Sequence, residues 1–205
     1  MYAAQQDVQT QTPPQKTLDV YFLKGETMFV ELAKKRRSIK VYTAQPVEPE
    51  KVQAIIESAL RAPSGRAARP CSFIVVNDKK LLEKLSVAKP MGAQFIKDVS
   101  VAIIVCADPS QSHLWIEDCA IAAVSIQYAA CSMDLGSRWA HMRNNNFSDG
   151  KSSRDYIAEL LDLPKNLDVE CIIGIGYPGE EIAPYRMEDL AFDKVSYNRY
   201  GQKNS

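Results

Sequence analysis

The segment KKRRSIKVY, residues 34–42, holds side chains of the types that bind phosphate. Arg36, Ser38 and Lys40 alternate along it, and alternate side chains of an extended chain point to the same side. They would present a guanidinium, a hydroxyl and an ammonium together, a set that suits a phosphate group. A solvated basic face is the plainer interpretation of such a run. Arg37 fits either interpretation, and the two lysines before it fit the solvated face.

Two further regions combine small residues with polar or aromatic ones. In RAPSGRAARP, residues 61–70, Pro-Ser-Gly follows a helix and makes a tight loop. Its amides and serine hydroxyl could bind the polar edge of a ring, and an ordinary helix-to-strand turn is the alternative. In DLGSRWAHM and GIGYPGE, residues 134–142 and 174–180, Gly136 and Gly176 permit close approach of another backbone.

The sequence lacks a convincing set of side chains for acid–base, nucleophilic or metal catalysis. The two histidines, His113 and His141, are not in metal-ligand spacing, and no Ser/His/Asp set or paired acid stands out. Five cysteines lie in apolar segments without a C-x-x-C pair, which is typical of a reduced, cytosolic chain. Neither a G-x-G-x-x-G turn nor a P-loop motif is present. An enzyme of this composition would depend on a cofactor for its chemistry.

Helices and strands alternate along the chain and must position these segments. Apolar spacing and capping residues predict helices over residues 28–37, 49–62, 79–85, 115–133 and 153–161. Short apolar runs predict strands over residues 73–76, 101–107, 137–140 and 170–176. The longest helix is apolar nearly all round, so it should lie in the centre of the fold or in a large interface. An α+β fold with a central sheet fits this pattern best.

Charge and composition narrow the class of protein further. A formal net charge of +0 and a pI of about 6.7 argue against a nucleic-acid partner, because a basic domain would be expected for one. No apolar run approaches the ~18 residues of a membrane span. Residues 1–27 are rich in Gln, Thr and Pro, and we expect a flexible extension there, followed by one domain over residues 28–205.

Taken together, the motifs resemble those of the FMN-dependent nitroreductase family. The resemblance rests on RRSIKVY, on APSGRAARP running into FIVV, on DCAIAAVSIQYAACSMDLGSRW, and on GYPGEE, YRMEDL and VSYNRYG near the end. It extends over roughly residues 28–201. It implies a nitroreductase-like α+β fold with a mostly antiparallel sheet surrounded by helices. It also implies a homodimer with FMN at its interface and a C-terminal tail exchanged between subunits.

The resemblance assigns cofactor-binding residues as well. The implied ligands of the FMN phosphate and ribityl chain are Arg36, Arg37, Ser38, Lys40 and Arg186. The implied neighbours of the flavin ring are Pro63, Ser64, Gly65, Trp139, Ala140 and His141. Arg66, Ala67, Arg69 and Gly176 are further candidates for the cofactor site. In the family, the loop at Pro63 belongs to the other subunit, and a backbone N–H of the Trp139 segment faces the flavin N5.

Three positions depart from the family's common pattern. Ala67 stands where the family commonly has Asn, Arg69 where it has Gln, and Cys71 where it has Trp. That Asn helps to hold the flavin edge. We expect Arg66 or Arg69 to compensate, because a cation near the flavin N1 and O2 would stabilise the anionic reduced ring.

The implied activity is hydride transfer from NADH or NADPH to FMN N5. Electrons would then pass to a nitroaromatic, a quinone or another electrophile by a ping-pong scheme. The resemblance leaves two alternatives open: a specialised flavin-fragmenting or reductively dehalogenating member, and a flavin-binding carrier or sensor without turnover. We expect no bound metal ion, no nucleic-acid partner and no membrane association. We expect the protein to be cytoplasmic.

Overall fold

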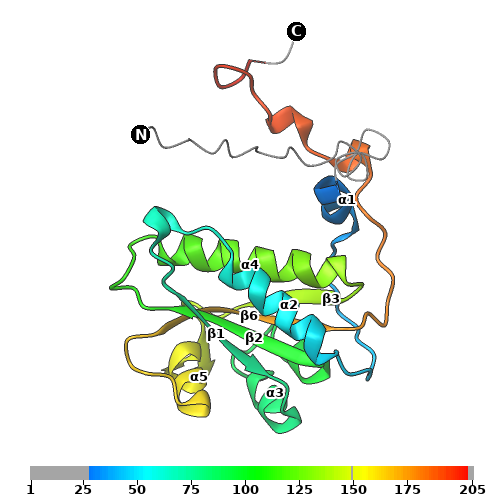
Figure 1. Ribbon diagram of the computed structural model, residues 1–205. Helices are drawn as coiled ribbons and strands as arrows, with labels where there is room; N and C mark the ends of the chain where they lie inside the picture. The colour runs from blue at the N-terminus through cyan, green and yellow to red at the C-terminus, as the bar shows by residue number, and fades with distance from the viewer. Residues whose placement is uncertain (1–27, 149, 203–205) are drawn as a thin grey trace, which may run out of the picture.

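The computed structural model, which describes residues 28–148 and 150–202, is built on a four-stranded sheet (Figure 1). The strands are β1 (Cys71–Val76), β2 (Val101–Ala107), β3 (Gly136–His141) and β6 (Asp168–Gly176). Their spatial order is β1-β2-β6-β3, and every neighbouring pair is antiparallel. The predicted α+β fold with an antiparallel sheet surrounded by helices is confirmed.

Position in the sheet explains how deeply each strand is buried. All residues of the central strand β2 are buried, as its uninterrupted apolar run predicts. The prediction of a buried strand over residues 73–76 is correct in position but wrong in burial. In β1 only Val76 is buried, and Val75 is 40% exposed. The reason is that β1 is an edge strand of the sheet.

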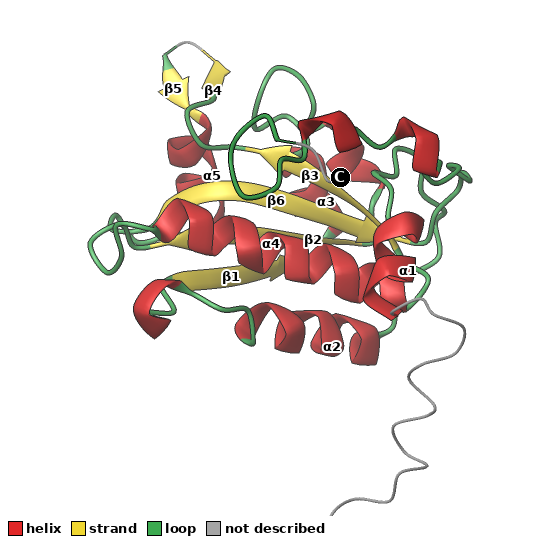
Figure 2. Cartoon of the chain, turned by 90° about the horizontal axis from the view of Figure 1, so that it is seen from above, coloured by secondary structure: helices red, strands yellow, loops and turns green. Residues whose placement is uncertain are grey.

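Helices cover both faces of the sheet. On one face lie α2 (Pro49–Leu60) and α4 (Trp115–Ser132), and on the other lie α3 (Lys79–Leu85) and α5 (Ser153–Leu161) (Figures 1 and 2). A 3-10 helix, η4 (Gln94–Asp98), which the sequence pattern did not predict, packs beside α3. Two apolar cores result, one on each side of the sheet.

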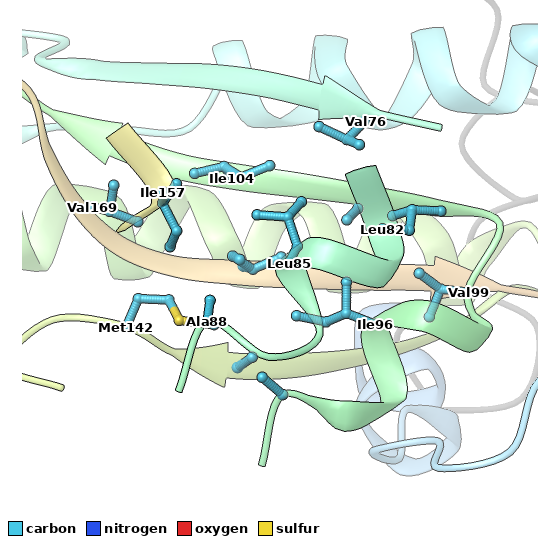
Figure 3. Packing of buried hydrophobic residues seen from close by; sticks show 14 of the residues in the cluster. Val76, Leu82, Leu85, Ala88, Ile96, Val99, Ile104, Met142, Ile157 and Val169 are labelled. Carbon is cyan, nitrogen blue, oxygen red and sulfur yellow. The ribbon is translucent and has the colours of Figure 1, made fainter. Parts of the chain in front are cut away.

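The core under α3 and α5 is packed by side chains from both the sheet and the helices (Figure 3). Leu82, Leu85 and Ile157 come from the helices, and Ile104 and Ile172 come from the strands. Each of the five is at most 1% exposed. Full burial of such a side chain stabilises a fold by about 1.5–3 kcal/mol, so this core holds the sheet rigid beneath the site described below.

The predicted long apolar helix is present as α4, but it lies on one face of the sheet and is not enclosed in the centre of the fold. It packs against the sheet and against α2, but Ile121 and Val124 on its outer side are 40% and 43% exposed. The short helix α1 (Met28–Lys35) lies along it, and the rings of Phe29 and Tyr128 are 4.8 Å apart. The structure thus leaves an apolar surface on the outer side of α4.

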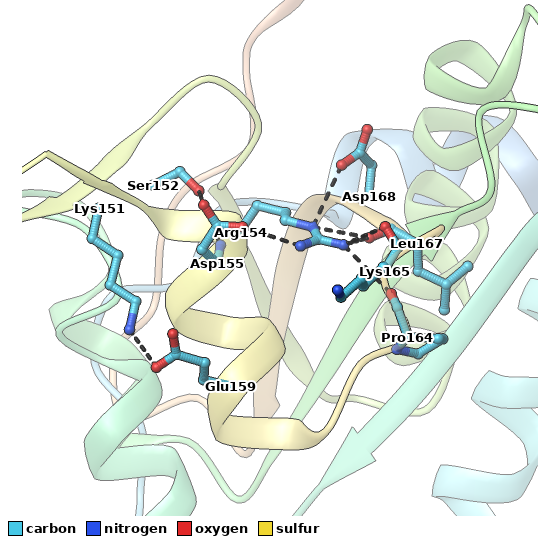
Figure 4. Close-up of polar contacts among 9 residues, drawn as sticks. All are labelled: Lys151, Ser152, Arg154, Asp155, Glu159, Pro164, Lys165, Leu167 and Asp168. Carbon is cyan, nitrogen blue, oxygen red and sulfur yellow. Dashed lines mark hydrogen bonds and ion pairs between the residues drawn. The ribbon is translucent and has the colours of Figure 1, made fainter.

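Side-chain caps fix the start of two helices, as predicted. The side chain of Asp78 accepts a hydrogen bond from the backbone N–H of Leu81 in α3, and Ser152 accepts one from Asp155 in α5. Next to the second cap, the guanidinium of Arg154 donates to the carbonyl oxygen of Leu167, which ties α5 to the loop before β6 (Figure 4).

The rest of the chain is formed by a small hairpin and an extended tail. The hairpin, β4 (Asn146–Ser148) and β5 (Lys151–Ser152), falls in a segment for which no element was predicted. After β6 the chain leads away from the sheet with two short 3-10 turns, η5 (Met187–Asp189) and η6 (Phe192–Lys194) (Figure 1). The predicted extension over residues 1–27 lies outside the described residues.

Between residues 28 and 202, no helix combines the length and apolarity that a membrane span requires. In the same described part of the chain, no group of three or more His, Cys, Asp or Glu side chains is placed to hold a metal ion.

Candidate functional site

The segment that follows α1 runs as an extended chain beside β3. Ile39 donates its backbone N–H to the carbonyl oxygen of Ser137 at 3.2 Å, and Ser38 pairs with Ser137 as a parallel bridge. Further on, Thr43 donates its N–H to the carbonyl of Tyr177 at 2.9 Å. The segment is therefore paired with β3 and with the residue that follows β6. The predicted common side for Arg36, Ser38 and Lys40 is not seen, because Arg36 lines a cleft with Arg37 and Ile39, whereas Ser38 and Lys40 do not.

Glycines let this segment approach the sheet, as the sequence predicts. A Cβ on Gly136 would stand 2.7 Å from Cγ1 of Ile39, and one on Gly176 would stand 3.0 Å from Cδ1 of Tyr42. Real Cβ atoms essentially never come as close as the first of these. Gly136 is therefore the residue that allows residues 36–40 to lie against β3.

A carboxylate that the sequence analysis missed holds the same segment from the other side. Oε1 of Glu180 accepts the backbone N–H of Val41 at 3.0 Å and also that of Lys40. These two hydrogen bonds lower the pKa of the Glu180 carboxyl below its ordinary value. The motif GYPGEE contained the residue, but nothing in the sequence paired it with residues 40 and 41.

A cleft of about 520 Å³ opens where α1, β3 and the chain after β6 meet. Its lining includes Gly136 and Ser137 from β3 and the whole basic run, Lys34, Lys35, Arg36 and Arg37. Ser38 and Lys40 are exposed outside this lining. The volume falls in the range of small-molecule and cofactor sites.

Three of the four basic side chains of this cleft bind other groups of the protein. Lys34 pairs with Glu31 at 2.9 Å, and Lys35 pairs with Asp134. Arg37 donates to the carbonyl of Ala183 and lies 4.1 Å from the ring centre of Tyr185. Lys34, Lys35 and Arg37 therefore already bind other groups of the protein.

Arg36 differs from its neighbours. Its side chain is half-buried in the cleft and makes no hydrogen bond or ion pair with any residue that the structure describes. A half-buried guanidinium without a partner loses hydration and gains nothing in return, so it is suited to an anionic ligand. Among the described basic residues 34–37, Arg36 is the one whose side-chain N–H groups line the cleft without an acceptor in the protein.

The edge of β3 continues from the cleft toward the other predicted ring contacts. In an antiparallel strand the backbone groups of alternate residues point to opposite sides. Because Ser137 turns its carbonyl to Ile39, the backbone N–H and C=O of Trp139 also point away from β6. The Trp139 and Ala140 side chains pack into the two cores, whereas Nδ1 of His141 lies 3.4 Å from the buried Glu170 carboxylate.

The loop after α2 is held in an unusual conformation. Arg66, Ala67 and Arg69 have φ values of 52°, 55° and 48°, in the left-handed region that L residues rarely adopt. A carboxylate that the sequence analysis missed stabilises the loop. Oδ1 of Asp118, a 2%-exposed residue of α4, accepts the N–H of Gly65 at 2.8 Å.

The loop's own serine adds a second constraint. Oγ of Ser64 accepts the N–H of Arg69 at 2.9 Å, which leaves the hydroxyl proton of Ser64 free to donate to another acceptor. Pro63, Ser64 and Arg69 line a separate pocket of about 240 Å³. The Arg66 and Arg69 side chains are exposed beside it.

The predicted site residues therefore fall into two groups. Residues 36–40 and the start of β3 lie together at the C-terminal end of α4, where Cys131 lines the cleft. The loop at residues 63–69 lies at the other end, beside Asp118. Thirteen residues of helix separate these two positions, a distance of about 20 Å at 1.5 Å per residue.

Five predicted residues stand apart from both groups. Trp139, Ala140 and His141 follow further along β3, as described above, and Arg186 and Gly176 lie elsewhere. Arg186 pairs with Asp189 at 3.0 Å and with Glu188 in the exposed tail, and it does not line the cleft. Gly176 is buried at the end of β6 against the ring of Tyr42.

Comparison with known proteins identifies the family. The model of the nitroreductase family matches residues 33–105 and 86–177, which together include most of the chain. The chain belongs to the nitroreductase family. A putative NADH dehydrogenase/NAD(P)H nitroreductase of Archaeoglobus fulgidus is 35% identical over 158 residues, which is 75% of this chain and 87% of that protein.

Solved nitroreductase structures share the fold. An FMN-dependent nitroreductase from Clostridium difficile R20291 superposes with a TM-score of 0.82 at 42% identity, over 83% of this chain and 99% of that one. The NADPH:FMN oxidoreductase from Vibrio harveyi, solved with NAD+, gives a TM-score of 0.69 at 25% identity, over 85% of this chain and 79% of that one.

The residues of this nitroreductase fit the phosphate end of FMN, the cofactor that the family implies. The cleft offers the guanidinium of Arg36 without a protein partner, and Gly136 lines its wall. The neighbouring edge of β3 adds backbone groups that point away from the sheet. A phosphate needs charge-assisted donors of this kind. The assignment of individual residues to FMN stays a prediction.

Proposed function

We propose that this nitroreductase is an FMN-dependent oxidoreductase that takes reducing equivalents from NADH or NADPH. Its acceptor is a nitroaromatic, a quinone or another electrophilic small molecule. Membership of the nitroreductase family supports the proposal, as do the relatives whose names include NAD(P)H nitroreductase and NADPH:FMN oxidoreductase. The observation that carries it for this chain is the half-buried, unpartnered guanidinium of Arg36 in the cleft.

In this proposal the chain's residues hold and orient the cofactor. Arg36 binds the phosphate, and Ser38 and Lys40 reach it from the exposed side of the same segment. Glu180 keeps that segment against β3 through the N–H groups of Lys40 and Val41. The N–H of Trp139, which points away from β6, would donate to the flavin when it is bound. FMN, when bound, supplies the hydride chemistry.

The nicotinamide and the acceptor occupy one face of the site in turn, which is a ping-pong scheme. The scheme agrees with the absence of a separate dinucleotide motif in the sequence. A flat site used in turn by two substrates needs no second binding domain, and residues 28–205 form the single FMN-binding domain of the proposal.

A second copy of the chain completes the site. Within one chain the loop at residues 63–69 is about 20 Å from the Arg36 cleft, measured along α4. The outer side of α4, helix α1 and the C-terminal tail expose apolar side chains, among them Phe29 at 59% and Phe192 at 60%. We propose a homodimer in which these surfaces meet and the partner's loop reaches the flavin ring. We place it in the cytoplasm, in keeping with its free cysteines.

The test compares FMN affinity in two variants of the same basic run. Arg36→Ala removes the free guanidinium and should raise the FMN dissociation constant by about 10- to 150-fold, because hydrogen bonds to charged groups contribute about 1.5–3 kcal/mol. Lys34→Ala is the matched control, since Lys34 already pairs with Glu31 on the surface. Its dissociation constant should stay within about threefold of the wild type, as expected for a surface ion pair.

Absorbance reports the activity itself. The yellow FMN-loaded protein should bleach with NADH or NADPH and recover its colour when an acceptor is added. A protein that binds FMN but is never bleached would be a carrier or sensor, and a protein that cannot be loaded with FMN would overturn the proposal. Size exclusion that reports a stable FMN-loaded monomer would overturn the shared site.

A further inference from the structure

Two cysteines meet at the loop that follows α2. Cys71 is the first residue of β1, and Cys119 lies in the second turn of α4. Their Sγ atoms are 3.7 Å apart, and both thiols are free. The sequence gives no hint of the pair, because the two residues are 48 positions apart.

We propose that Cys71 and Cys119 are a redox-active thiol pair, in which a hydroperoxide oxidises Cys71 and Cys119 then closes a disulfide. The reaction needs no flavin, only these two side chains and an added oxidant. Cys71 nevertheless shares its pocket with Ser64 and Arg69 of the loop assigned to the flavin ring, so the test uses the FMN-free protein as well as the FMN-loaded one.

The geometry requires little movement. A disulfide bond is about 2.05 Å long, so the two sulfur atoms must approach each other by about 1.7 Å. Both residues sit on elements that pack against each other, β1 and α4. A cysteine side chain moves its sulfur by rotation about the single Cα–Cβ bond. Cys71 is half-buried at the end of an edge strand, where such a shift displaces few neighbours.

Access and acidity assign different roles to the two thiols. Cys71 lines the pocket of about 240 Å³ together with Ser64 and Arg69, so a small oxidant can reach it. Cys119 is 0% exposed and cannot be reached directly. The contact between the two sulfur atoms lowers the pKa of Cys71, whereas the same contact and burial raise the pKa of Cys119. The thiolate is the reactive form, so Cys71 is the site of attack.

The chemistry balances with a hydroperoxide as the oxidant. The Cys71 thiolate attacks the terminal oxygen of ROOH, the O–O bond breaks, and RO⁻ leaves with the electron pair and takes a proton from water. The sulfenic acid at Cys71 then meets the sulfur of Cys119. An S–S bond forms, the S–O bond breaks, and the proton of Cys119 leaves with the hydroxide as water. Two thiols are oxidised and one peroxide is reduced.

The remaining cysteines are placed less well for this reaction. Cys106 and Cys171 are both 0% exposed, and the thiol of Cys106 points to the carbonyl oxygen of Ser72 at 3.3 Å. Cys131 lies in the last turn of α4, twelve residues beyond Cys119 and about 18 Å away along the helix. Cys131→Ser is therefore a matched control, because it removes a buried thiol of the same helix and leaves the pair intact.

The test is a thiol count and a peptide map of the full chain after treatment with hydrogen peroxide. Remaining thiols are blocked with N-ethylmaleimide in denaturant, and the protein is cut with trypsin and with an endoproteinase specific for Glu. Because Arg69 precedes a proline, Cys71 appears in the peptide of residues 67–79. Cys119 appears in the peptide of residues 118–138, which is separated from Cys106 by the cut after Glu117.

The wild type and Cys131→Ser should each lose two thiols and yield the 67–79 peptide linked to the 118–138 peptide. Cys71→Ser should lose none at the same dose. Cys119→Ser should keep a sulfenic acid at Cys71 that dimedone labels. A Cys71 that stays unmodified, or a 67–79 peptide linked to a second copy of itself, would overturn the inference. The 118–138 peptide also contains Cys131, so fragmentation of the linked peptide by tandem mass spectrometry assigns the bond to Cys119 or to Cys131. With that assignment the map of the wild type decides the question even if a variant fails to fold, and a bond to Cys131 would overturn the inference.

Discussion

Replacing Gly136 by alanine should push the segment that carries Arg36 away from the sheet. The new Cβ would stand 2.7 Å from Cγ1, 3.0 Å from Cβ and 3.2 Å from Cγ2 of Ile39. Neither side can yield easily. Gly136 is held by its pairing with Gly176 in the sheet, and Ile39 is 8% exposed and hydrogen-bonded to Ser137.

The expected cost is that of an overpacked core, about 1–3 kcal/mol of unfolding free energy. For a chain of this length each kcal/mol lowers the melting temperature by about 2–4 °C. The FMN dissociation constant should rise as well, because the displaced segment carries the proposed phosphate ligand.

A second substitution tests whether the contact with Ile39 is the cause. Ile39→Ala removes Cγ1 and Cγ2, the atoms at 2.7 and 3.2 Å, and by itself should cost about 2–5 kcal/mol as a large-to-small core change. The Gly136→Ala/Ile39→Ala double variant should cost less than the sum of the two single variants by at least about 0.5 kcal/mol.

Urea denaturation of all four proteins measures these differences. The reasoning fails if Gly136→Ala leaves the midpoint unchanged, or if the two substitutions are additive within about 0.3–0.5 kcal/mol.

Three further predictions concern carboxylates. Asp118→Ala removes the acceptor for the Gly65 N–H, so it should cost about 1.5–3 kcal/mol in urea denaturation and speed tryptic cleavage after Arg66; equal cleavage rates would contradict this. Hydrogen bonds to the side chain of Asp108 lower its pKa to about 2, so its contribution to stability is present above about pH 4 and is lost as the pH falls through about 2. Asp108→Asn should flatten the fall in stability over that range, and an unchanged pH profile would refute the assignment. Glu180→Ala should raise the FMN dissociation constant more than Glu180→Gln, which keeps an acceptor oxygen; equal effects would argue against that role.

Local patterns were sufficient to predict most of the fold. The run VAIIVCA could only be a buried strand, and Asp78 and Ser152 marked two helix starts that the structure confirms. Burial of β1 was overestimated, because an apolar run does not tell whether a strand is central or at an edge. The 3-10 helix at residues 94–98 has no periodic pattern to announce it.

Much of the candidate site depended on contacts between distant residues. Alternation pointed to residues 36–40, but the partners that distinguish Arg36 from Arg37 come from the other end of the chain, such as Tyr185. Asp118 and Glu180 were missed for the same reason. Each is one acidic residue among many in the sequence, and only the fold brings it to the backbone N–H groups that it binds.

The edge of β3 has a consequence for the solubility of the protein. An uncovered edge strand is a template on which a second chain can add a strand, and aggregation begins in that way. Here Ile39 covers the edge at Ser137, and Lys89 and Asn145 bind the carbonyl oxygen of His141. The open stretch between them is one residue long, too short for another strand to pair with. The β3 edge can thus offer a single backbone N–H and C=O to a small ligand without offering a template on which another strand could pair.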